Sequence, residues 1–208
     1  MTAVTRLKII RDEDKNTAQS RKSSGRRGPR KATPRHLERV ALYYLERYAS
    51  SAENLRRVLM HRVKRSASVH GTDCNEGALV VDEIIRKFQE WSYLNDRAYA
   101  EMRVDGLHRR GLSVRAIRHR LMLKGVLEDD INIALEALAA ETPHPDRHAA
   151  IAYARRRCMG PWRLNDRESH RERDLAALGR QGFSFDIARW VVDADSPEMC
   201  EVSLSEEN

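Results

Sequence analysis

Residues 110–126 read RGLSVRAIRHRLMLKGV, and this stretch decides the fold class. Ser113 is suited to cap a helix whose apolar residues Ile117 and Leu121 lie four positions apart on one face. Gly125 suits the end of that helix, because a left-handed backbone conformation carries no steric cost at glycine. The stretch therefore predicts a short amphipathic helix with a defined beginning and end.

The ending of this helix recurs along the chain and indicates an internal repeat. Residues 121–126 (LMLKGV) and 178–183 (LGRQGF) share a leucine, a long polar residue, a glycine and a final apolar residue at identical spacing. The final apolar residue can pack back on the helix that it follows. Leu55 and Leu59 match the apolar pair of the helix above, but an insert at 66–77 replaces the glycine there.

The rest of the sequence between residues 35 and 195 has the three-and-four spacing of amphipathic helices, with apolar positions that include Met102 and Phe185. No stretch alternates every second residue, as a half-buried strand would. We therefore predict an all-α protein of tandem three-helix units, stacked into an elongated or curved array because each unit alone has a small core. The expected segments are a disordered basic arm (1–34), repeat 1 (35–94, with a loop in the insert 66–77), repeat 2 (95–142), repeat 3 (143–195) and a frayed acidic tail (196–208).

Composition narrows the class of protein. Of the 208 residues, 41% are hydrophobic, 33% are charged and only 6% are aromatic, which argues against one large sandwich or barrel core. No apolar run approaches the roughly 18–20 residues that a membrane span needs, and the N-terminus lacks a signal-peptide pattern. The three cysteines show no CxxC spacing and are expected as free thiols. We expect a cytoplasmic monomer.

The net charge of +7 comes from one segment. Residues 20–36 hold seven Lys or Arg and no acid, which equals the whole surplus. Elsewhere the charges are segregated: 56–65 and 103–124 are strongly basic, whereas 128–141 and 193–208 contain acids and no Lys or Arg. Such segregation suggests a surface that meets a polyanion on one side and avoids it on the other.

Basic side chains in three groups are therefore candidates for contacts with phosphates or an acidic protein surface. For the helical groups, the alternative is a solvated face whose cations complement the carbonyl ends of helices. The arm is either a flexible polycation that adds salt-sensitive DNA affinity or a solubilising tail. The candidates are Arg109, Arg110, Arg115, Arg118, Arg120 and Lys124; Arg56 and Arg57; and Arg26, Arg27, Arg30 and Lys31.

Catalytic patterns are weak. Residues 106–113 imitate the spacing of a phosphate-binding P-loop, but Leu112 replaces the required lysine and the segment follows no strand. His144 and His148 are four residues apart, yet a metal site would want a third strong ligand. We expect no catalytic residue, metal or cofactor.

A family resemblance lies in the same region. Residues 92–100 (SYLNDRAYA) resemble the RecX family signature GYLDD-x-RFA, with Ser92 and Asn95 in place of the usual Gly and Asp. Residues 110–126 resemble the family block RxxG-x-x-x-I-x-x-x-L-x-x-K-G-I, and the match is strong from about 91 to 138.

The resemblance implies tandem three-helix units that bind the RecA–DNA filament, inhibit its ATPase and strand exchange, and contact DNA. The predicted function is therefore regulation of the RecA recombinase in homologous recombination and DNA repair. A general single- or double-stranded nucleic-acid-binding module without a recombinase partner is the alternative. An enzyme such as a nuclease would need clustered carboxylates for a metal, and none stands out.

Overall fold

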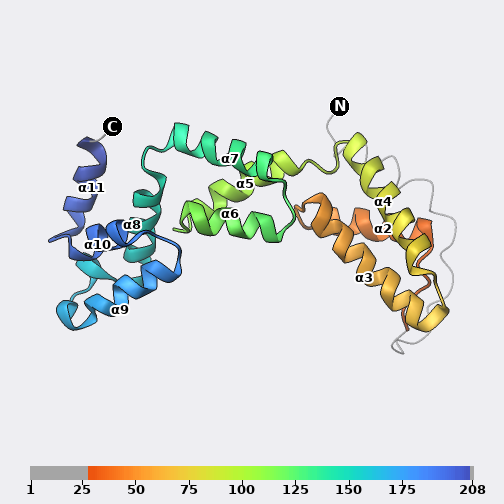
Figure 1. The fold of residues 1–208 in the computed structure, drawn as a ribbon, viewed down its shortest axis with the longest axis horizontal. Coiled ribbons are helices and arrows are strands. Elements are labelled where there is room, and N and C mark those ends of the chain that lie inside the picture. The colour runs from red at the N-terminus through yellow and green to blue at the C-terminus, as the bar shows by residue number, and fades with distance from the viewer. Residues whose placement is uncertain (1–27, 207–208) are drawn as a thin grey trace. The chain divides into compact units, whose positions relative to one another are not determined.

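The computed structural model describes residues 28–206, with side chains up to residue 202. Every regular element in that range is a helix, so the all-α prediction is confirmed (Figure 1). The chain divides between Asn95 and Asp96 into two compact units. None of the helices in the described range is both long enough and apolar enough to cross a membrane.

The first compact unit contains α2 (Pro34–Leu45), α3 (Ala52–His70) and α4 (Cys74–Glu90). Each helix begins at a residue whose side chain accepts a backbone N–H, namely Thr33, Ser51 and Asp73. Apolar residues from all three helices meet in a first core, made of Leu37, Ala41, Leu55, Leu59, Val63, Val81, Ile84, Phe88 and Leu94.

The loop that we expected at residues 69–77, within the insert 66–77, is much shorter than predicted. α3 continues to His70 and α4 begins at Cys74, so only a short turn joins them. Gly77 lies inside α4, where an added Cβ would come within 2.4 Å of Val63 on α3. The glycine that suggested a loop instead allows two long helices to pack closely.

The connection after α4 explains one departure from the family pattern. Ser92, at the place of the usual glycine, has a φ of 59°, in the left-handed region that glycine tolerates best. The backbone N–H groups of Tyr93 and Leu94 then donate to the carbonyl of Phe88, which closes the end of α4. The turn geometry, and not side-chain chemistry, accounts for the glycine preference at this position.

The second compact unit begins with α5 (Asp96–His108), α6 (Val114–Leu123) and α7 (Glu128–Glu141). The predicted beginning and end of α6 are confirmed: the Ser113 hydroxyl accepts the N–H of Ala116, and Gly125 has a φ of 73°. Met102, expected on a core face, is exposed. The second core contains Tyr99, Ala100, Val104, Leu107, Leu112, Ile117, Leu121, Val126, Ile131, Ala134, Leu135 and Leu138.

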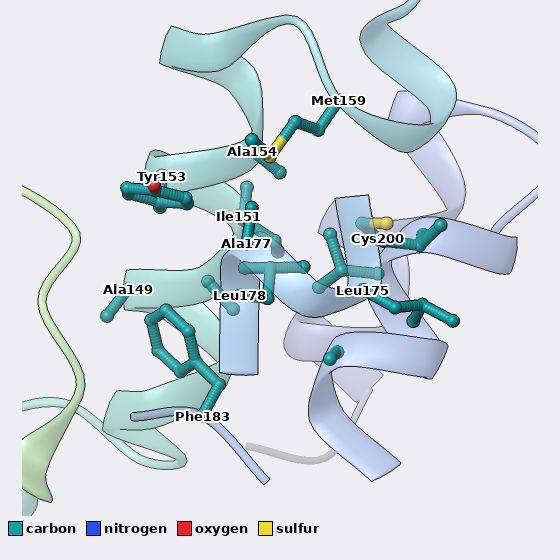
Figure 2. Packing of buried hydrophobic residues seen from close by; sticks show 14 residues of the cluster. Ala149, Ile151, Tyr153, Ala154, Met159, Leu175, Ala177, Leu178, Phe183 and Cys200 are labelled. Atoms are coloured by element: carbon teal, nitrogen blue, oxygen red, sulfur yellow. The ribbon is translucent and has the colours of Figure 1, made fainter. Parts of the chain in front are cut away.

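The same unit continues with α8 (Pro145–Arg157), η2 (Gly160–Trp162), α9 (Arg167–Arg180), α10 (Phe185–Asp193) and α11 (Pro197–Glu206). The repeated turn is confirmed here too, because Gly182 has a φ of 93° and Phe183 after it is buried. Phe185, in contrast, is exposed. Figure 2 shows the third core, made of Ala149, Ala150, Ile151, Tyr153, Ala154, Met159, Leu175, Ala177, Leu178, Phe183, Ala188, Val191, Val192 and Cys200.

The frayed tail expected at 196–208 is also wrong over most of its length. The Ser196 hydroxyl accepts the N–H of Met199 at the beginning of α11. Cys200 is buried in the third core, and Glu201 pairs with Arg155 of α8. One buried side chain and one ion pair thus hold an acidic helix against the arginine-rich end of α8.

Hydrogen bonds join the second and third cores within this unit. The Ser113 hydroxyl donates to the carbonyl of Gln181 (2.7 Å), and the N–H of Val114 donates to the carboxylate of Asp146 (2.7 Å). Nε2 of His108 donates to the carbonyl of Pro145 at 2.7 Å. The beginning of α6 is therefore fixed by groups from α8 and from the turn after α9.

Candidate functional site

Three of the predicted arginines project freely from the α5–α6 region. Arg110 follows α5, and Arg115 and Arg120 lie on α6; all three are exposed. Within the described part of the chain, none of them forms an ion pair or a side-chain hydrogen bond. Their full charge is available to an external anion, and we call Arg110, Arg115 and Arg120 the free arginines.

The other candidates in this region have partners inside the protein. Arg118 donates from Nη1 to Oδ1 of Asn132 at 2.6 Å and lies 3.7 Å from Glu128, so it holds α6 against α7. Arg109 pairs with Asp105 one turn earlier at 2.7 Å. Lys124 is exposed and has an interaction partner within the protein. The basic cluster is therefore only partly uncompensated.

Arg56 and Arg57 of α3 are also paired. Nε of Arg56 lies 2.7 Å from Oδ1 of Asp82 on α4, and this hydrogen bond, together with the attraction of the Asp82 charge, raises the pKa of Arg56. Arg57 pairs with Glu53 at 3.0 Å. Both arginines serve contacts within the first unit, so their net charge toward a partner is small.

The segment before α2 forms a second basic site. Residues 28–33, expected to be disordered, contact α3: the N–H of Ala32 donates to the Ser66 hydroxyl at 2.8 Å, and Nε2 of His70 donates to the carbonyl of Pro29 at 2.6 Å. Lys31 is exposed. The predicted contacts at Arg26 and Arg27 lie outside the described residues.

A hollow of about 300 Å³ lies between this segment and α3. Arg30, which the sequence predicted, lines it with His36, Arg62 and Arg65, which were not singled out. Burial lowers the pKa of His36, and the positive charges of Arg39, Arg30 and Arg62 lower it further. The hollow therefore holds a strongly positive potential, which the run of basic residues at 56–65 signalled only in part.

In the described residues, no three His, Cys, Asp or Glu side chains lie close enough to hold a metal ion. His148 is partly buried, and its burial and then the charges of His108 and His144 lower its pKa. The exposed arginines without internal partners are suited to binding an anionic partner.

The comparisons with known proteins agree with the local motifs. The family model described as "RecX, second three-helix domain" matches residues 95–135, which span α5, α6 and most of α7. "Regulatory protein RecX" of Myxococcus xanthus is 40% identical over 186 residues, 88% of this chain and 98% of that protein. The protein of the same name in Agrobacterium fabrum is 36% identical over 106 residues, 50% of this chain and 54% of that protein.

Two solved structures share the fold. A crystal structure of regulatory protein RecX has a TM-score of 0.55 at 21% identity and covers 77% of this chain and 72% of its own. The crystal structure of RecX from Lactobacillus salivarius has a TM-score of 0.52 at 23% identity, with 83% and 97% covered. With the Myxococcus relative matching almost end to end, the chain belongs to the RecX family of non-enzymatic regulatory proteins.

Proposed function

We propose that this chain binds the RecA–DNA filament and inhibits the ATPase and recombinase activity of RecA in recombination and DNA repair. The family membership supports RecA as the partner. The free arginines support binding through contacts with anionic groups. We also propose that it acts as a cytoplasmic monomer of three three-helix units, 35–94, 95–142 and 143–195. Three separate cores support that division.

The observation on which this proposal depends is the difference between free and paired arginines on one short helix, α6. Arg118 of α6 is held by Asn132 and Glu128, whereas Arg115 and Arg120 meet no acid in the described part of the chain. An arginine that is already paired gains little from a new anion, while a free one gains a charge-assisted contact. The free arginines are therefore the side chains that we assign to the filament, through DNA phosphates or acidic protein surface.

The test replaces all three free arginines by glutamine. Three phosphate or acidic contacts are worth at least about a tenfold change in affinity, so the half-inhibitory concentration for DNA-dependent ATP hydrolysis by RecA should rise at least about tenfold. The control replaces Arg86, Arg97 and Arg189, each paired within its own helix, and changes net charge equally. Equal inhibition by the two triple variants would refute the assignment.

The alternative is a nucleic-acid-binding module that needs no recombinase, and the basic hollow near Arg30 favours it. The two functions differ in one titration. Inhibition at concentrations where free single-stranded DNA stays unbound supports the filament as target. Inhibition that appears only once the DNA is sequestered supports the alternative.

A further inference from the structure

A second basic hollow lies beside the third core, and its lining includes none of the candidate arginines considered above. It measures about 490 Å³ and lies between the C-terminal end of α8, the loop with η2, and α9. Its polar lining is dominated by arginines that were not candidates from sequence: Arg156, Arg157, Arg163, Arg173 and Arg180.

The carboxylate in this lining is already neutralised. Asp174 is buried, and its two oxygens accept from Nη2 of Arg163 at 2.8 and 3.2 Å and from the N–H of Gly160 at 3.1 Å. Arg163 and Asp174 therefore cancel. The other four arginines form no ion pair with any residue that the structure describes, so the hollow carries a net charge of about +4.

Packed side chains form the floor of the hollow. Met159 and Ala177 reach it from the third core, where Figure 2 shows both among the packed side chains. On α9, Arg173 and Arg180 lie seven residues apart on one face with the small Ala177 between them, which leaves room above it.

The guanidinium groups of the four arginines without an ion pair leave their hydrogen-bond donors available to an anion that enters the hollow. The planar fork of arginine binds the tetrahedral oxygens of phosphate through paired hydrogen bonds. We propose that this hollow binds a phosphate group, either a phosphodiester of a DNA strand or the phosphate of a small molecule. The site belongs to the third core and is separate from the free arginines.

Cys158 provides a reporter, because it lies in the lining and its thiol is exposed. With Cys74 replaced by serine, the one remaining exposed thiol in the described range is Cys158, since Cys200 is buried. Labelling with the neutral reagent N-ethylmaleimide is followed in chloride, in inorganic phosphate at equal ionic strength, and with a short oligodeoxythymidine. Phosphate should slow the labelling several-fold and saturably.

The variant Arg173→Gln with Arg180→Gln should abolish this protection. Both side chains are exposed, so the fold should survive, and unchanged circular dichroism checks it. The control Arg86→Gln with Arg97→Gln loses equal charge and should keep the protection. If the oligonucleotide protects at far lower phosphate concentration than inorganic phosphate, the source is a DNA strand; if the two are equal, it is a small phosphate.

No protection beyond chloride, or protection that survives in the α9 double variant, would overturn the proposal. The experiment contains no recombinase. A negative labelling result would therefore refute the phosphate site and would not affect the proposed RecA inhibition. A negative result in the inhibition titration would refute the role of the free arginines and would not affect the phosphate site.

Discussion

Arg163 neutralises a carboxylate inside the third core, so its replacement by methionine should destabilise that part of the protein strongly. The side chain of Asp174 is only 3% exposed. Arg163 supplies two of its hydrogen bonds and its counter-charge, and the N–H of Gly160 supplies the third bond. In Arg163→Met the carboxylate keeps one backbone donor and no cation.

Breaking a buried ion pair from one side costs about 3–5 kcal/mol, because the remaining charge stays desolvated. Arg163 itself is 22% exposed, so water can partly replace it and the expected loss is about 3 kcal/mol. The double variant Arg163→Met with Asp174→Asn removes the stranded charge while an amide oxygen can still accept from Gly160. It should recover to within about 1 kcal/mol of the parent protein.

Urea unfolding monitored by tryptophan fluorescence measures this difference. In a Trp91→Phe background the signal comes from Trp162 and Trp190, which both pack against the third core. A loss below about 1 kcal/mol in Arg163→Met would show that the pair does not carry the stated energy. A double variant no more stable than the single one would show that the stranded charge is not the cause.

Four further variants test what individual residues contribute to stability. Gly111 has a φ of 72° and an added Cβ would come within 2.7 Å of the backbone of α8, so Gly111→Ala should cost more than about 2 kcal/mol in urea unfolding. Gly106→Ala, inside α5 with open space around it, should instead add up to about 1 kcal/mol; equal effects would contradict the geometry. Ser92→Gly should stabilise the first unit by up to about 1 kcal/mol by relieving the left-handed residue, and a loss would count against that strain. The hydrogen bond from Arg171 lowers the pKa of Asp193, so the stabilisation from this carboxylate is present above the ordinary aspartate pKa of about 3.9 and is lost as the pH falls through the lower folded value. The difference in unfolding free energy between the parent and Asp193→Asn should hold steady above about pH 5 and shrink below about pH 4, and a difference unchanged down to pH 2 would exclude the linkage.

The local features of the helices could be predicted because they depend on neighbours in sequence. Ser113 and Gly125 determine the beginning and end of α6 through contacts within a few residues. Gly77 and Cys200 were misjudged because their roles depend on distant groups. The first makes room for Val63, and the second anchors an acidic helix in a core that sequence alone does not reveal.

The candidate site was predictable only as a set of charges. Sequence spacing shows which arginines share a helix face, but it cannot show which of them already have an internal partner. Arg118 and Arg56 look equivalent to Arg115 in sequence, yet Asn132 and Asp82 hold them. The hollow of the third core was missed for the same reason, since its arginines come from two helices and the loop that joins them.

The shared capping of α6 has a mechanical consequence. Because the first amide of α6 donates to Asp146 and its capping hydroxyl donates to Gln181, a rotation of one bundle against the other would break both hydrogen bonds. The two bundles should therefore move together as one rigid body. The arginines on α6 and those on α9 would then keep a constant separation. This unit would bind best to a strand or surface whose anionic groups have the same spacing.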